Sequence, residues 1–406
     1  MSSRFSKLPP YQGDPILALM ETFMGDPRPS KVSLGIGLYF DEAGRLPVLD
    51  AVRSARETLA RKGGPMPYLP MEGSAAYRHV VQDLVFGPAH AAVAEERICT
   101  VATLGGSGAL RVGADFLRSQ LGCNQVFLPD PTWDNHSALF LGAGYQVQTY
   151  PYYDSRSRAL GFDAMVERLQ SLPPACVILL HASCHNPTGI DLSVPQWKTL
   201  SRVMGERGLI PFIDMAYQGF GSGLDEDAWA VRFLADQGHE FLVANSFSKN
   251  FSIYGERAGG LSVVCKDPAA AALVLGQLKL VVRGSYSTPP AHGAALVETI
   301  LASGELRQTW TDELSGMRQR IRNMREGLHA ALMGCCGPST QFDYLLSQQG
   351  MFSYTGLTPT QVQTLRKDHG IYLIDTGRLC ISGLTTASIA HVAQAIASVT
   401  SLTHTD

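Results

Sequence analysis

The chain carries, at residues 241–250, the stretch FLVANSFSKN, an apolar run that ends in two serines and a lysine. A short apolar run of this kind is typical of a strand buried on both faces of a sheet. Similar runs recur between residues 95 and 265, separated by Gly- or Pro-containing loops and helical stretches: Ile98–Ala102, Val126–Leu128, Val177–Leu180, Leu209–Ile213 and Leu261–Cys265. This alternation predicts an α/β fold with a largely parallel, buried sheet.

Length and charge limit the class of protein. The 406 residues suffice for two to three domains at about 150 residues each, and 33 Lys+Arg against 36 Asp+Glu leave a net charge of −3. That balance gives no reason to expect nucleic acid or an anionic membrane as a partner. Residues 1–14 hold no apolar signal segment, and no window approaches 18 uninterrupted apolar residues. We therefore expect a cytoplasmic protein without nucleic-acid or membrane partners.

The eight cysteines are dispersed, with no CxxC pair and no Cys/His spacing suited to a metal. Such usage is typical of reduced, mostly buried thiols. The sequence therefore indicates neither a zinc site nor a disulfide framework, and we expect no metal.

Apolar residues at steps of three and four between Leu314 and Leu332 predict one long amphipathic helix. After it, Gly350–Tyr354 and Ile371–Ile374 are expected strands. We interpret this last part of the chain as a second, smaller lobe that the helix joins to the first.

Ligands of open parallel sheets bind outside the carboxyl ends of the strands, so the residues after each run are candidates. The run Ile98–Ala102 is followed at 103–110 by TLGGSGAL, a glycine-rich loop at the start of a predicted helix. Such a loop can hold a phosphate with its backbone N–H groups, although a tight strand-to-helix turn explains the glycines equally well. It matches neither GxGxxG nor GxxxxGK[ST], which counts against nicotinamide and nucleoside triphosphate sites.

Asp214 and Lys249 each follow one of the predicted strands. A buried carboxylate at a strand end is costly unless a positive group meets it, the alternative being a helix N-cap. Lys249 could hold an aldehyde as a Schiff base, while Ser246, Ser248 and Arg257 could bind a nearby phosphate.

Pyridoxal 5′-phosphate needs all of these parts together. It requires a lysine for its aldehyde, an anion cradle for its phosphate, and a carboxylate that keeps its ring nitrogen protonated. Trp133 offers a plane for ring stacking, and Asn186 and Tyr217 offer hydrogen bonds to the phenolic oxygen. The residues thus favour this cofactor.

Three motifs, NPTG at 186–189, SFSKNF at 246–251 and YGER at 254–257, resemble those of the class I aminotransferases of fold type I. The likeness runs from about Gly13 to Ile396. Within that family the chain looks most like the bacterial aromatic-amino-acid aminotransferases of the aspartate aminotransferase branch. That narrower likeness rests on GLYF at 37–40, GGSG at 105–108, GGLS at 259–262 and GMFSYTGL at 350–357.

The resemblance implies a large pyridoxal-phosphate domain over residues 46–318, with a mostly parallel seven-stranded sheet flanked by helices. It implies a smaller α+β domain from residues 15–45 and 319–406, and an N-terminal arm over 1–14. It also implies a homodimer whose active sites are shared across the interface.

For the chemistry, the resemblance implies that Lys249, Asp214 and Tyr217 are catalytic. Lys249 would bond the cofactor and move the substrate α-proton. Asp214 would pair with the ring nitrogen, and His136 would support that aspartate from behind. Tyr217 and Asn186 would hydrogen-bond the phenolic oxygen while Trp133 stacks on the ring.

The resemblance also places the phosphate and the substrate. The phosphate contacts would be Gly106, Ser107, Ser246, Ser248, Arg257 and, from the neighbouring subunit, Tyr68. Arg378 would bind the substrate α-carboxylate, and Arg283 of the other subunit would bind a side-chain carboxylate. Gly37 lies where the family closes over the substrate, and Trp133 and Asn186 would also contact the substrate. Phe352 fits this lid, although a plain core phenylalanine is an equal alternative.

We therefore expect transamination of phenylalanine, tyrosine and also aspartate with 2-oxoglutarate by a ping-pong mechanism. The alternative is a dedicated aspartate aminotransferase. A pyridoxal-dependent lyase or decarboxylase is a weaker interpretation, because Arg283 and Arg378 together provide for two carboxylates. A cofactor-holding regulatory protein would leave the retained catalytic residues unexplained.

Overall fold

The computed structural model describes residues 4–11, 13, 15–337 and 340–401. Of the expected arm over 1–14, residues 1–3, 12 and 14 therefore lie outside the described residues. The rest of the arm contains one 3₁₀ turn, η1 (Phe5–Lys7). Within the described residues no helix is long and apolar enough to cross a bilayer.

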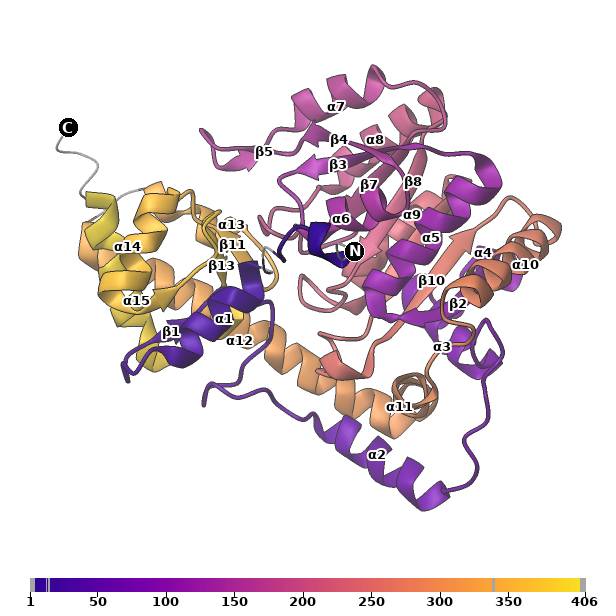
Figure 1. Ribbon diagram of the computed structural model, residues 1–406, viewed down its shortest axis with the longest axis horizontal. Helices are drawn as coiled ribbons and strands as arrows, with labels where there is room; N and C mark the ends of the chain where they lie inside the picture. Colours follow the sequence, from indigo (N-terminus) through magenta and orange to yellow (C-terminus); the bar gives the residue numbers. More distant parts are fainter. Residues whose placement is uncertain (1–3, 12, 14, 338–339, 402–406) are drawn as a thin grey trace.

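A seven-stranded sheet forms the centre of the molecule, in the order β2-β10-β9-β8-β7-β3-β4 (Figure 1). Neighbours from β9 to β4 run parallel, whereas β10 is antiparallel to both β2 and β9. The strands are β2 (Ile98–Leu104), β3 (Gln125–Asp130), β4 (Gln146–Pro151), β7 (Val177–His181), β8 (Ile210–Met215), β9 (Phe241–Ser246) and β10 (Ala258–Val264). The expected seven-stranded, mostly parallel sheet is confirmed.

One strand of the sheet, β4, does not have the apolar pattern of the others. β4 lies at the edge of the sheet, and its sequence QVQTYP has only one fully buried residue, Tyr150. An edge strand needs no continuous apolar run, because one side of it faces away from the core.

Helices cover both faces of this sheet. Val177 and Leu179 pack into one apolar cluster, which contains residues of α5 (Gly105–Leu121) and α10 (Pro268–Ser285), while Ile178 and Leu180 pack into the other. Alternate side chains of a strand point to opposite faces, so burial on both faces explains the unbroken apolar runs. The other helices of this part of the chain are α2 (Asp50–Lys62), α3 (Ala75–Phe86), α4 (Ala91–Ala94), α6 (Asn135–Gly142), α7 (Phe162–Gln170), α8 (Val194–Arg207), α9 (Leu224–Asp236) and α11 (Ala291–Ala302).

The long helix expected between Leu314 and Leu332 is α12 (Gly304–Cys336), and it extends beyond the expected bounds at both ends. Its apolar side is buried along the whole length, from Trp310 to Leu332. One part of α12 packs against α2 and α11, and another against α15 (Thr386–Ser401) and α13 (Tyr344–Ser347). As Figure 1 shows, α12 runs from the region of the large sheet to the C-terminal elements.

Those C-terminal elements form two small ladders together with part of the N-terminal region. β1 (Val32–Ser33) pairs in parallel with β12 (Ile371–Tyr372), and β11 (Phe352–Tyr354) pairs antiparallel with β13 (Arg378–Cys380). The two expected strands are thus present in shorter form. Around them lie α1 (Pro15–Gly25), α14 (Pro359–His369), η3 (Thr340–Phe342) and η4 (Ile381–Gly383). The domain bounds expected above stay a prediction; the bound at 318/319 falls inside α12.

Candidate active site

A cavity of about 240 Å³ lies beyond the carboxyl ends of the parallel strands. It is lined by Ile16, Ile36, Gly37, Gly106, Ser107, Leu110, Trp133, Asn186, Asp214, Ala216, Tyr217, Ser246, Ser248, Lys249, Tyr254, Arg257, Phe352 and Arg378. All the site residues predicted from the sequence are among them except Tyr68, His136 and Arg283. The cavity lies where the topology of an open parallel sheet places a ligand.

One wall of the cavity is a cluster of hydrogen-bond donors. Arg257 Nη1 lies 3.4 Å from Ser248 Oγ, and the Ser246 hydroxyl donates to Ser248 Oγ at 3.2 Å. The N-terminal residue of α5, Gly105, follows Leu104, which supplies no side-chain cap to the first N–H groups of the helix. No carboxylate of the described residues pairs with Arg257. The guanidinium also donates to the carbonyls of Tyr254 and Leu104 but keeps its charge without a carboxylate partner. Uncapped N–H groups, two hydroxyls and this guanidinium together suit a dianion such as phosphate.

The glycines of this wall are required by close packing as well. Gly105 has φ +66°, and a Cβ there would lie 2.8 Å from Arg257 Nη2. A Cβ at Gly106 would lie 3.2 Å from the Cβ of Ser246. Both explanations offered for the glycine loop therefore apply, because the tight turn is what brings the helix N-terminus to the serines and the arginine.

Lys249 lines the cavity and comes three residues after β9 ends at Ser246. Burial lowers the pKa of its ammonium group from 10.5 to about 8, and the nearby Asp214 carboxylate limits that fall. Its Nζ lies 4.8 Å from the centre of the Tyr217 ring. About a tenth of this amine is therefore uncharged at pH 7, far more than for an ordinary lysine, and a proton acceptor or nucleophile requires the uncharged form.

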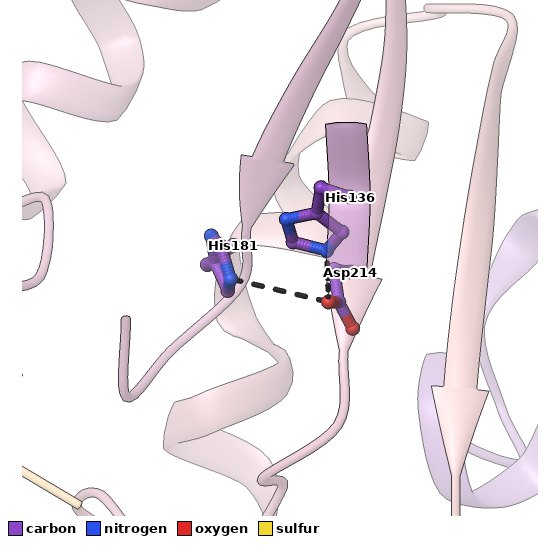
Figure 2. A group of neighbouring side chains, drawn as sticks. All are labelled: His136, His181 and Asp214. Carbon is purple, nitrogen blue, oxygen red and sulfur yellow. Dashed lines mark hydrogen bonds and ion pairs between the residues drawn. The ribbon is translucent and has the colours of Figure 1, made fainter. Parts of the chain in front are cut away.

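Asp214 is part of β8 and does not cap a helix, so the N-cap alternative is wrong. Figure 2 shows its Oδ2 facing two imidazoles, with His136 Nε2 at 3.0 Å and His181 Nε2 at 3.9 Å. Because a carboxylate only accepts, His136 Nε2 carries the proton, and its Nδ1 faces the Thr132 hydroxyl at 2.8 Å. His136 thus supports Asp214 from behind the cavity.

The carboxylate of Asp214 is stabilised in its charged form although the side chain is buried. Burial by itself would raise the pKa of the carboxyl group, but the hydrogen bond from His136 and the charges nearby, including that of Lys249, lower it overall. Burial lowers the pKa of His181 to about 4, so this imidazole is uncharged at neutral pH. The side chains of His136, His181 and Asp214 each offer an atom that could bind a metal ion, and these atoms lie within 4.8 Å of one another. The spacing of residues in the sequence did not indicate this group.

Three lining residues, Tyr217, Asn186 and Arg378, are connected by hydrogen bonds. Asn186 Nδ2 donates to the Tyr217 hydroxyl at 3.3 Å, and Arg378 Nη1 donates to Asn186 Oδ1 at 3.2 Å. Arg378 Nη2 donates to the Gly35 carbonyl at 2.8 Å, and Nε is buried without a partner in the described part of the chain. Since no described carboxylate pairs with it, this guanidinium can take up a carboxylate ligand.

The aromatic walls are Trp133 and Phe352. Trp133 packs edge to face on His136, with ring centres 5.2 Å apart. Phe352 is 2% exposed and lies over the Arg378 guanidinium at 4.5 Å, and a Cβ on Gly37 would meet its ring at 2.9 Å. Phe352 is therefore both a core residue and a wall of the cavity, so the two alternatives for it coexist.

Two predicted residues do not reach the cavity within one chain. Tyr68 is 92% exposed in the loop after α2. Arg283 is exposed near the C-terminal end of α10, where it donates to Ser287 Oγ. These are the two residues for which the sequence resemblance implied a contribution from a neighbouring subunit.

Several lining residues were not predicted. Tyr254 belongs to the YGER motif, and its hydroxyl accepts from the Tyr39 N–H at 2.8 Å, so its place in the motif was the available signal. Ile16, Ile36, Leu110 and Ala216 are apolar residues without any chemical signature in the sequence. His181 ends β7 at the same edge of the sheet as Asp214, a position that the strand pattern alone could have indicated.

The amine of Lys249 is expected to titrate near pH 8 in the protein without a ligand. Acetic anhydride labelling followed over pH, with each lysine peptide quantified by mass spectrometry, measures this midpoint. In Asp214→Asn the midpoint should fall further, because the opposing carboxylate is removed. A midpoint at the ordinary lysine value of about 10.4 would contradict the assigned environment.

Comparison with known proteins gives consistent results. A family model described as aminotransferase class I and II matches residues 29–396. The chain is 50% identical to the aromatic-amino-acid aminotransferase of Escherichia coli (strain K12) over 396 residues, which are 97% of this chain and 100% of that protein. It is 46% identical to an aspartate aminotransferase of Pseudomonas aeruginosa over 397 residues, 98% of this chain and 100% of that protein.

Solved structures of aminotransferases resemble this chain as well. The aromatic-amino-acid aminotransferase from Burkholderia pseudomallei, covalently bound to pyridoxal phosphate, has a TM-score of 0.96 and 47% identity, covering 98% of this chain and 100% of that chain. The family model spans nearly the whole chain, and the similarity extends over the full length of these relatives. The chain therefore belongs to the class I and II aminotransferases.

Proposed function

We propose that this chain transfers the amino group of aromatic L-amino acids, and also of aspartate, to 2-oxoglutarate in a ping-pong cycle, with pyridoxal 5′-phosphate as cofactor. The observation that carries the proposal is the convergence of Lys249 and Asp214 on one cavity. That cavity has a phosphate-type donor wall on one side and the unpaired Arg378 on another. The relatives named for aromatic amino acids and for pyridoxal phosphate support it.

The residues present fit this cofactor. Ser246, Ser248, Arg257 and the N-terminus of α5 would hold the phosphate, with Gly106 and Ser107 supplying N–H groups. Lys249 would take the aldehyde, and Asp214 would face the ring nitrogen. Bound there, the cofactor supplies an electron sink for the electrons of the substrate Cα–H bond.

The chain's own residues would handle the proton. Lys249 Nζ, with its lowered pKa, would accept the α-proton of the donor and, in the second half of the cycle, would give a proton to the α-carbon of the new amino acid. Asp214, held ionised by His136, would keep a proton on the ring nitrogen of the cofactor. Tyr217, whose pKa burial raises, stays a phenol and donates with Asn186 at the phenolic oxygen. Trp133, which lines the cavity, would stack on the ring of the cofactor and exclude water there.

Substrate recognition would rest on two arginines. Arg378 binds the α-carboxylate, which every amino-acid substrate carries. Arg283 binds the second carboxylate of aspartate or 2-oxoglutarate. The apolar lining from Ile16, Ile36 and Leu110 favours aromatic side chains as well, which is why we prefer the broader activity to a dedicated aspartate aminotransferase.

The second subunit would complete the site. We propose a cytoplasmic homodimer in which Arg283 and Tyr68 reach the partner's cavity. Both are exposed in the single chain, and exposed apolar side chains accompany them: Met66 beside Tyr68, and Leu273 and Leu280 on α10. Exposed apolar residues of this kind are typical of an interface.

The first test is a half-reaction without 2-oxoglutarate. Cofactor-loaded protein is mixed separately with L-phenylalanine, L-tyrosine and L-aspartate, and the cofactor absorbance is followed by stopped flow. Each of the three amino acids should change the absorbance within one turnover, since each carries the α-carboxylate that Arg378 binds. A response to aspartate alone would favour the dedicated aspartate aminotransferase, and no response to any would contradict transamination of these amino acids.

Arg283→Leu should lower kcat/KM for aspartate by about 100-fold, because the substrate carboxylate loses a partner worth roughly 3 kcal/mol. The kcat/KM for phenylalanine should fall by less than about tenfold. Steady-state kinetics with both donors test this. Equal losses would indicate that Arg283 supports the fold.

The shared site is tested by complementation. Lys249→Ala and Arg283→Leu chains are co-expressed with different tags, and the mixed dimers are isolated. A mixed dimer should regain one complete site and therefore about half the wild-type aspartate activity. If each site belonged to one chain, the mixed dimers would show no activity beyond that of the parent variants.

A further inference from the structure

Arg325 of α12 is a buried arginine without a carboxylate partner. It is 4% exposed, and no described carboxylate lies within ion-pair distance of it. Burial lowers its pKa to about 10, so it stays charged at neutral pH. An unpaired charge in the interior is costly unless hydrogen bonds to it are numerous.

All of the acceptors of Arg325 lie on one stretch of chain. Hydrogen bonds to a charged donor are among the stronger ones in proteins, so this arginine orders the segment that it binds. Its acceptors are the carbonyl oxygens of Leu345 (3.4 Å), Gln349 (3.2 Å), Gly350 (2.8 Å) and Phe352, and the hydroxyl of Ser353. Four of these five acceptors belong to residues 349–353, which are called the 349–353 segment below.

The same segment is in contact with the loop that carries Asn186. Gln349 N–H donates to the Gly189 carbonyl at 2.6 Å. Gly189 has φ +69°, and a Cβ there would lie 2.5 Å from the Phe352 carbonyl oxygen. Two backbones in such close contact leave little room for the 349–353 segment to shift without disturbing the cavity wall.

Phe352 is the residue of this segment that reaches the cavity. Its ring lies over the Arg378 guanidinium at 4.5 Å and 5.9 Å from the Tyr217 ring, centre to centre. β11, which holds Phe352, also pairs with β13, which holds Arg378, with Phe352 opposite Cys380. The position of the Phe352 ring therefore determines one face of the environment of Arg378.

We propose that Arg325 is a positioning residue that holds Phe352 against Arg378 and thereby sets the affinity for the substrate α-carboxylate. Arg325 itself does not line the cavity, so it acts only through the 349–353 segment. The inference rests on the proposed role of Arg378. Because every amino-acid substrate carries an α-carboxylate, the effect of Arg325 is common to aromatic and dicarboxylic substrates.

The test is binding of 3-phenylpropionate, an aromatic carboxylate without an amino group, to the cofactor-loaded protein by isothermal titration calorimetry. Arg325→Met should raise the Kd by about tenfold, and Arg325→Lys should restore part of the affinity. In turnover, KM for phenylalanine and for aspartate should rise together while kcat changes less than about threefold. Arg322→Met is the matched control: Arg322 lies on the same helix but donates to the Gly221 carbonyl and not to an acceptor of the 349–353 segment, and the Kd of this variant should equal that of the wild type.

A double-mutant cycle with Phe352→Ala separates positioning from general stability. If Arg325 acts through Phe352, then Arg325→Met adds no further loss of affinity in the Phe352→Ala protein. An unchanged Kd in Arg325→Met, or a full additional loss in the Phe352→Ala background, would overturn the inference. Should Arg325→Met not fold, Ser353→Ala removes one acceptor of Arg325 and is compared in the same way.

Failure of the inference differs from failure of the proposed function. If the wild-type protein binds 3-phenylpropionate but Arg325→Met binds it equally well, only the role of Arg325 is overturned. If the wild-type protein does not bind the probe, the role of Arg378 fails, and the inference that rests on it fails too.

Discussion

Two opposite charges inside the protein, the ammonium of Lys249 and the carboxylate of Asp214, are the constraint on which the rest of the site depends. Burial opposes both ionised forms, and each charge limits the effect of burial on the other. The parallel pairing of β8 with β9 brings both groups to the same edge of the sheet. His136 then stabilises the carboxylate from behind, which leaves the amine as the group with the adjustable proton.

The remaining parts of the fold place ligand-binding groups of the protein around that pair. The α5 N-terminus, Ser246, Ser248 and Arg257 provide for an anion on one side, and the β11–β13 ladder brings Arg378 and Phe352 to another. α12 connects these two regions and carries Arg325, whose hydrogen bonds fix the 349–353 segment, which includes the start of β11. The helix that links the lobes therefore also influences the wall of the site.

Much of this was predictable from the sequence where the physical signal is local. Strands buried on both faces have unbroken apolar runs, so six of the seven strands were found, and the polar edge strand β4 was not. The residues at strand ends followed from topology, and the family motifs supplied His136 and Arg378. The antiparallel direction of β10 could not be read from its composition, because an apolar run gives no direction. Arg325 was also missed, since in sequence it is one of several arginines on a helix and only the structure shows which of them is buried.

The central claim is that Lys249, and no other lysine, is the residue that holds the cofactor. The most direct measurement is to reduce the pyridoxal-phosphate-loaded protein with sodium borohydride, digest it, and map the pyridoxyl group by mass spectrometry. The account predicts the label on Lys249 and its loss in Lys249→Ala. A label on another lysine, such as Lys279 of α10, or the absence of any stable label, would contradict it.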